Sequence, residues 1–227
     1  MISINSLISH IANKRHFKSV YQKYKQFTMI PEASFYDNLT LASSVKEIPG
    51  CIVECGVWRG GMSAGIASVL GTKRTYHLFD SFEGLPQASE IDGPSAIAWQ
   101  NNSKSEAFFD NCSATPNYAE KAMQIAGAAK VNIVKGWFNQ TLPQYHFEDE
   151  IALLRLDGDW YESTQDCLNN LYKLVTPGGL IIVDDYYDWD GCARALHDFL
   201  SKNNLTDRIK SIGRTCYLVR GKSIIKT

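Results

Sequence analysis

Short apolar runs alternate with segments of helical periodicity over most of the chain. The runs predict seven strands, at residues 51–56, 75–81, 131–136, 151–157, 180–185, 209–213 and 215–221. Apolar residues at helical spacing predict helices between them, at residues 61–70, 119–129, 162–175 and 192–200. Strands that alternate with helices form a mainly parallel sheet covered on both faces. We therefore predict an α/β fold with a doubly wound, mostly parallel, seven-stranded sheet.

The N-terminal segment follows a different pattern. Its apolar residues recur at helical spacing, at Ile4, Leu7, Ile8, Ile11, Phe17, Val20, Tyr21, Tyr24 and Phe27. It also carries five basic residues, Lys14, Arg15, Lys18, Lys23 and Lys25, and no acid before Glu32. A basic amphipathic helix contacts an anionic lipid surface or packs on protein, and we predict the second, on its own domain or on a second subunit. We expect a helical arm over 1–40, a single domain over 41–227, and a homo-oligomer.

Residues 82–113 are polar and irregular, and they are too numerous for a plain connection between two elements. Loops of this length inside a compact domain are usually functional. We therefore predict a functional loop or insert here.

Composition narrows the class of protein. The chain has 227 residues, 44% of them hydrophobic, and a net charge of -1, which suits one globular domain and does not favour nucleic acid as a partner. No run approaches the ~20 apolar residues of a membrane span. The first apolar stretch is broken by Asn5 and His10 and precedes its basic residues, unlike a signal peptide. The six cysteines form no C-x-x-C pair, so we expect reduced, buried thiols and a cytoplasmic protein.

The first candidate site is ECGVWRGG, residues 54–61, directly after the first central strand. Glu54 ends that strand, Gly56 allows a tight turn, and two more glycines follow at Gly60 and Gly61. Dinucleotide sites need G-x-G-x-x-G to seat a pyrophosphate, whereas here Trp58 occupies the turn. The pattern favours S-adenosylmethionine, a ligand with an amino-acid end and no pyrophosphate. Asp80 ends the next strand, where a carboxylate reaches ribose hydroxyls or caps a turn.

Two acidic pairs follow two later strands: Asp157 and Asp159, then Asp184 and Asp185. Ligands of open α/β sheets bind beyond the carboxyl ends of the strands, so neighbouring strands would bring these acids together. Basic residues nearby are few, namely Arg155 and Arg194. Oxygen ligands without a counter-charge favour Mg²⁺. Helix capping is the alternative, but it accounts for one or two acids and not for two pairs.

Several blocks give the chain a family resemblance. ECGVWRGG, YHLFDSFEGLP, KGWFNQTLP and DGDWYEST, with GGLIIVDDY after them, lie within residues 28–220. In these blocks the sequence resembles the macrocin O-methyltransferase family. The resemblance implies a Rossmann-like class I fold, use of S-adenosylmethionine, a requirement for Mg²⁺, and methyl transfer to a hydroxyl of a sugar or glycoside.

The resemblance also implies roles for individual residues. Asp157, Asp184 and Asp185 match the metal ligands, and Asp159 matches the proposed general base. The positions that match cofactor contacts are Glu54, Gly56, Val57, Trp58, Gly60, Asp80, Ser81, Gly136, Trp137 and Phe138. No substrate motif of the family occurs in residues 82–113, so the acceptor stays open.

Three other functions deserve comparison. A metal-dependent methyltransferase of a catechol-like small molecule would use the same carboxylates. A non-catalytic subunit that binds S-adenosylmethionine has no use for four acids at one site. An NAD-dependent oxidoreductase conflicts with the glycine pattern and with the lack of a Tyr/Lys or Cys/His arrangement suited to hydride transfer.

Overall fold

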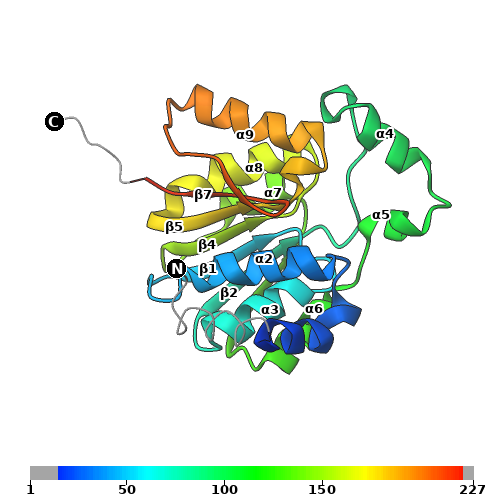
Figure 1. Ribbon diagram of the computed structural model, residues 1–227. Helices are drawn as coiled ribbons and strands as arrows, with labels where there is room; N and C mark the ends of the chain where they lie inside the picture. The colour runs from blue at the N-terminus through cyan, green and yellow to red at the C-terminus, as the bar shows by residue number, and fades with distance from the viewer. Residues whose placement is uncertain (1–14, 222–227) are drawn as a thin grey trace, which may run out of the picture.

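The computed structural model describes residues 15–221 and contains one seven-stranded sheet (Figure 1). The strand order is β3-β2-β1-β4-β5-β7-β6. The strands are β1 (Cys51–Cys55), β2 (Thr75–Asp80), β3 (Lys130–Lys135), β4 (Ile151–Leu156), β5 (Val175–Val183), β6 (Lys210–Ile212) and β7 (Thr215–Val219). Strands β1 to β5 pair in parallel, while β7 runs antiparallel to both β5 and β6. The predicted fold class, with a mostly parallel sheet of seven strands, is confirmed.

Helices cover both faces of the sheet (Figure 1). The covering helices include α2 (Glu32–Ser43), α3 (Gly61–Leu70), α6 (Pro116–Ala126), α8 (Tyr161–Leu171) and α9 (Asp190–Lys202). The short helix α7 (Phe138–Thr141) follows β3, and α4 (Pro94–Asn101) and α5 (Phe109–Cys112) lie beside the sheet. Side chains of consecutive strand residues point to opposite faces. Ile52 therefore packs with the core under α2, α3 and α6, while Val53 packs with the core under α8 and α9. Because both faces are buried, the central strands read as continuous apolar runs.

The structure moves one predicted boundary that matters for the site. The predicted helix over 162–175 ends at Leu171, and the chain passes through the 3-10 turn Tyr172–Leu174 straight into β5. That strand ends at Val183, so Asp184 and Asp185 belong to a 3-10 helix, η6 (Asp184–Tyr187). The predicted strand over 180–185 therefore began too late and ended two residues too late. Both acids of η6 line the cavity described below.

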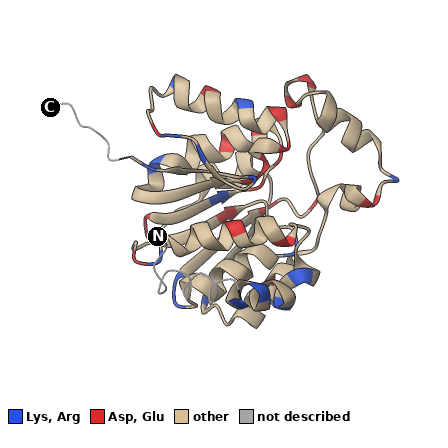
Figure 2. Ribbon diagram, in the orientation of Figure 1, with Lys and Arg blue, Asp and Glu red and all other residues tan. Residues whose placement is uncertain are grey.

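The N-terminal helix packs on its own domain. Residues 15–24 are helical and continue into η1 (Lys25–Phe27), and the apolar face is buried at Phe17, Val20, Tyr24 and Phe27. Lys23 Nζ donates a hydrogen bond to the carbonyl oxygen of Ile125 in α6 at 3.1 Å. The basic residues Arg15, Lys18, Lys23 and Lys25 are exposed, and Figure 2 marks basic positions along this part of the ribbon. The predicted apolar positions Ile4, Leu7, Ile8 and Ile11, and Lys14, lie outside the described residues.

Residues 82–113 form an insert with structure of its own. It contains η2 (Glu90–Asp92), α4, η3 (Glu106–Phe108) and α5, and it stands beside the sheet at the right of Figure 1. Trp99 of α4 packs with Trp160 and Trp189, which joins the insert to the main domain. These contacts come from distant parts of the chain, so the sequence pattern did not predict the helices.

Two further expectations concern thiols and membranes. All six cysteines are free, and five of them are buried. Over residues 15–221, no helix combines the length and the apolar character needed to cross a membrane.

Candidate active site

A cavity of about 630 Å³ opens beyond the carboxyl ends of β1, β2, β4 and β5. Its walls come from the β1–α3 turn, the end of β2, the β4–α8 turn, η6 and the segment from Phe27 to Ser34. Acidic stretches of the ribbon gather at this edge of the sheet (Figure 2). The volume falls in the range of small-molecule sites. Parallel strands bring their carboxyl ends to one edge, so residues far apart in sequence line a single cavity.

The β1–α3 turn is tightly packed. Gly56 has a φ of 87°, and a Cβ added there would lie 1.8 Å from the carbonyl oxygen of Asp157. Gly60 has a φ of 79° and faces α6, where a Cβ would lie 2.7 Å from the Cα of Ala119. Gly56, Val57 and Trp58 line the cavity. Close packing against α6 thus accounts for a glycine at position 60, while its predicted contact with the cofactor stays a prediction.

Asp80 holds this turn from the end of β2. Its Oδ2 accepts hydrogen bonds from the backbone N–H groups of Val57 at 2.7 Å and Trp58 at 2.8 Å. Its Oδ1 accepts one from the N–H of Phe82 at 2.6 Å. Burial raises the pKa of Asp80, and these three donors oppose that rise. Asp80 therefore caps the turn, the alternative reading of this residue, while its contact with a ribose stays a prediction.

The remaining predicted cofactor residues also lie near the cavity. Ser81, Trp137 and Phe138 line it. Gly136 stands one step back, with a φ of 144° and its N–H donating to the carbonyl oxygen of Asp80 at 2.9 Å. Asp80 thus connects the segment after β3, which contains Trp137, to the β1–α3 turn, through its backbone carbonyl on one side and its carboxylate on the other.

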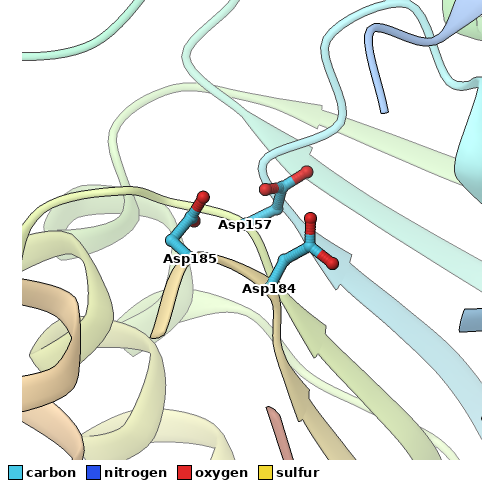
Figure 3. Close-up of side chains that lie close together, drawn as sticks. All are labelled: Asp157, Asp184 and Asp185. Carbon is cyan, nitrogen blue, oxygen red and sulfur yellow. The ribbon is translucent and has the colours of Figure 1, made fainter. Parts of the chain in front are cut away.

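Three carboxylates converge at the other side of the cavity (Figure 3). Asp157, Asp184 and Asp185 each offer one oxygen, and these oxygens all lie within 4.8 Å of one another. The register of the sheet explains the meeting, because Leu156 of β4 pairs with Val183 of β5 and the acids directly follow these residues. The convergence predicted from the two acidic pairs is therefore present in the structure.

Arg155 has a larger role in the site than the sequence analysis predicted, where it was only one of two basic residues near the acids. This fully buried guanidinium lies 2.8 Å from Asp157 Oδ2 through Nη1 and 2.8 Å from Asp184 Oδ2 through Nη2. Nη1 also lies 2.7 Å from Glu54 Oε1. Residues 155 and 157 are two apart on an extended segment and so share a face, which was the signal available in the sequence. Arg155 already supplies part of the counter-charge that had been assigned to a metal alone.

Asn38 of α2 completes this buried network, and no sequence pattern indicated it. Its Nδ2 donates to Asp184 Oδ1 at 3.0 Å, and its Oδ1 accepts from Arg155 Nε at 3.0 Å. At the far side, Ser63 Oγ donates to Glu54 Oε2. Burial raises the pKa of Glu54 to about 7, and Arg155 opposes the rise.

The charge balance still leaves room for a cation. Burial raises the pKa of Asp157 to about 6 against the opposing charge of Arg155. Burial, followed by the charge of Asp159, also raises the pKa of Asp185. Five carboxyl groups gather here, and Arg155 pairs with three of them: Glu54, Asp157 and Asp184. Neither Asp159 nor Asp185 has an ion pair within residues 15–221. An all-oxygen set of three carboxylates fits a hard divalent cation such as Mg²⁺.

Asp159 sits in a strained turn beside this cluster. It has a φ of 58°, in the left-handed region that non-glycine residues rarely adopt. Its N–H donates to Asp185 Oδ2 at 3.0 Å, and its Oδ1 accepts from Trp189 Nε1 at 2.9 Å. Helix capping does not explain this acid, because the N-cap of α8 is Trp160 and has no side-chain cap. Asp159 lines the cavity.

Solved structures place this fold among the Rossmann-like O-methyltransferases. The O-methyltransferase NovP matches with a TM-score of 0.73 and 30% identity, over 86% of this chain and 83% of that one. The calicheamicin methyltransferase CalS11 matches with a TM-score of 0.67 and 20% identity, over 97% and 94% of the two chains, and shares the fold.

Sequence comparisons then narrow the class. The sequence profile of the macrocin-O-methyltransferase (TylF) family matches residues 14–221, and the chain belongs to this family. Mycinamicin III 3''-O-methyltransferase of Micromonospora griseorubida is 33% identical over 171 residues, 74% of this chain and 66% of that protein. Demethyldecarbamoylnovobiocin O-methyltransferase of Streptomyces niveus is 35% identical over 177 residues, 74% and 65% of the two chains. The chain spans just under two thirds of the length of these curated relatives.

The carboxylate pairs predict how stability depends on pH in the absence of metal. Carboxyl groups in the unfolded chain lose their protons near pH ~4. Because the pKa values of Asp157 and Asp185 are raised, these groups keep their protons at higher pH in the folded protein. The contribution of Asp157 to the free energy of unfolding therefore falls as pH rises from about 4 through about 6, and the contribution of Asp185 changes in the same direction. In chelator, we expect the melting temperature of Asp185→Asn, relative to that of the unmutated protein, to rise with increasing pH. Thermal melts in which the melting temperature of Asp185→Asn, relative to that of the unmutated protein, rises toward low pH would contradict this prediction.

Proposed function

We propose that this chain transfers a methyl group from S-adenosylmethionine to a hydroxyl of a sugar or glycoside, in a reaction that depends on Mg²⁺. The observation that carries the proposal is the placement of the Glu54–Trp58 turn and the three carboxylates on the walls of one cavity. Membership of the macrocin-O-methyltransferase family supports the reaction class. The names of the relatives, which include a mycinamicin III methyltransferase and a rhamnosyl-tetracenomycin methyltransferase, support a glycoside as acceptor.

In this proposal the β1–α3 turn binds the cofactor. Glu54 near the end of β1 and Asp80 at the end of β2 both line the cavity. Glu54 would contact the amino-acid end of the cofactor, and Asp80 would contact the ribose. Trp137 and Phe138 give an apolar wall for the adenine. Because Glu54 and Asp157 share Arg155, the cofactor side and the acidic side of the cavity are held by one buried group.

Asp157, Asp184 and Asp185 would hold Mg²⁺ in this proposal. When bound, the ion would supply Lewis-acid polarisation of a hydroxyl whose pKa is otherwise far above 7. Asp159 would accept the proton of the attacking hydroxyl through Oδ2 as the methyl group is transferred. The walls of the cavity would align the acceptor oxygen with the methyl carbon, which supplies much of the remaining rate enhancement.

The N-terminal segment would close the acceptor side of the cavity. Met29, Ile30, Pro31 and Ser34 line the cavity, which supports a lid formed by the described part of the predicted helical arm over residues 1–40. Helix α2 runs from Glu32 to Ser43 and crosses the boundary proposed at residue 40, so this lid would share a helix with the main domain. We also propose that the chain acts as a homo-oligomer.

Methyl transfer from labelled S-adenosylmethionine tests the proposed function. The purified protein is incubated with Mg²⁺ and with panels of glycosides, nucleotide sugars and catechols. We expect label on a glycoside or sugar and none on a catechol. Label on catechols alone would establish the catechol-like alternative. Binding of NAD without binding of S-adenosylhomocysteine in calorimetry would contradict the proposed cofactor.

Asp80→Ala should weaken both the cofactor site and the fold. The substitution removes the proposed ribose contact, and a hydrogen bond to a charged group is worth about 1.5–3 kcal/mol, which is roughly ten- to a hundredfold in affinity. It also leaves three backbone N–H groups without their acceptor, so the melting temperature should fall as well. Calorimetry with S-adenosylhomocysteine and thermal melts measure the two effects. Unchanged affinity would remove the ribose role and leave Asp80 as a turn cap.

A further inference from the structure

The indole of Trp189 holds one oxygen of Asp159. Trp189 is the N-cap residue of α9, two residues after the end of η6, and its Nε1 donates to Asp159 Oδ1 at 2.9 Å. An indole N–H is a donor only, so it orients this oxygen and cannot take a proton from it. Within residues 15–221, the structure shows no hydrogen bond to Asp159 Oδ2. Oδ1 of Asp159 is therefore hydrogen-bonded, whereas Oδ2 is available to a ligand in the cavity.

The ring of Trp189 is itself held in place. It packs edge-on against Trp160 with ring centroids 5.2 Å apart, and against Trp99 of the insert with centroids 5.9 Å apart. Edge-to-face pairs at these separations are favourable arrangements for aromatic rings. Trp160 is 1% exposed, and its Nε1 donates to the carbonyl oxygen of Pro86 at 2.9 Å. The donor to Asp159 is thus part of a packed cluster of three tryptophans.

The backbone of the same turn is anchored from the insert. Buried Asp92 accepts a hydrogen bond from the N–H of Tyr161 through Oδ1 at 2.8 Å. It also packs on Gly191, where a Cβ would lie 2.6 Å from that same oxygen. A left-handed conformation at a non-glycine residue is strained and persists only where its surroundings enforce it. The turn at Asp159 is enforced from both the insert and the start of α9.

We propose that Trp189 is a positioning residue for Asp159, an inference that rests on the proposed function. The indole N–H occupies Oδ1, so that Oδ2 is the oxygen that takes the acceptor proton. As the acceptor oxygen bonds to the methyl carbon, the carbon–sulfur bond breaks, S-adenosylhomocysteine leaves, and the proton passes to Oδ2. Residues 82–113 contribute by packing Trp99 on this indole. The insert thereby helps to orient Asp159.

The test removes the N–H and keeps an aromatic ring. In Trp189→Phe we expect kcat to fall by about 10- to 100-fold, the range of one hydrogen bond to a charged group. KM and the affinities for Mg²⁺ and S-adenosylhomocysteine in calorimetry should stay within about twofold, since no binding group changes. A second variant carries 3-benzothienylalanine at position 189, where sulfur replaces the N–H in a bicyclic ring of the same shape. It should show the same loss and an unchanged melting temperature.

Two controls separate positioning from packing. Tyr172→Phe removes a side-chain donor to a different carboxylate, Asp207, and neither residue lines the cavity, so its kcat should stay within about twofold. In an Asp159→Asn background, Trp189→Phe should cause no further loss, because two residues that act as one unit are not additive.

The outcomes are distinct. An unmutated protein without methyl transfer to any acceptor overturns the proposed function. An active protein whose kcat is unchanged in both position-189 variants overturns the role of Trp189 alone. Loss of Mg²⁺ binding in those variants, or full additivity with Asp159→Asn, would also overturn it, because the effect would then come from folding or from another group.

Discussion

Replacing Asp159 with asparagine should lower turnover by ~10²–10⁴-fold, the loss typical of a missing general base. The amide cannot accept the proton of the acceptor hydroxyl. Its carbonyl oxygen still accepts the hydrogen bond from Trp189, and the backbone N–H still reaches Asp185, so the turn should keep its shape. Single-turnover rates and equilibrium dialysis with Mg²⁺ measure the two properties separately.

Binding is the control for this variant. Mg²⁺ and S-adenosylhomocysteine should bind Asp159→Asn almost as they bind the unmutated protein, because neither proposed site loses a ligand. Near-normal turnover would show that another group, or a bound water, takes the proton. Weak Mg²⁺ binding together with slow turnover would move Asp159 from the role of base to the metal site.

Asp185→Asn should abolish activity at ordinary Mg²⁺ concentrations by weakening the proposed metal site. Mutation of residues that only contact the ligands of a metal typically weakens metal affinity by about 10–100-fold. Loss of a carboxylate that itself binds the metal should therefore raise the Mg²⁺ requirement by more than about 100-fold. The amide still accepts the hydrogen bond from the N–H of Asp159, which keeps the local backbone in place. Titration of activity and of calorimetric heat with Mg²⁺ measures the effect.

Asp149→Asn provides a matched control. This exposed carboxylate precedes β4 at the opposite end of the strand from Asp157, so the variant loses one negative charge far from the cavity. Its Mg²⁺ dependence should match that of the unmutated protein. If the unmutated protein keeps full activity in excess chelator, Mg²⁺ has no part in the reaction.

The sequence determined the frame of the site. Buried parallel strands must be apolar on both faces, so the central strands were readable as uninterrupted runs, and acids placed directly after them had to lie at one edge of the sheet. This reasoning predicted that Asp157 would lie near Asp184 and Asp185. It could not predict that Asp184 and Asp185 form a 3-10 helix, because their turn follows from where β5 ends and not from local periodicity.

Other features were decided by tertiary structure alone. Arg155 reaches Glu54, Asp157 and Asp184 because the register of β1, β4 and β5 aligns them, and register is a property of pairing between distant strands. Asn38 joins them from a helix more than a hundred residues away in the chain. The polar insert over 82–113 reads as a loop because its tryptophan contacts lie outside it. Local pattern determines which residues end a strand, and packing between distant segments determines which groups they meet there.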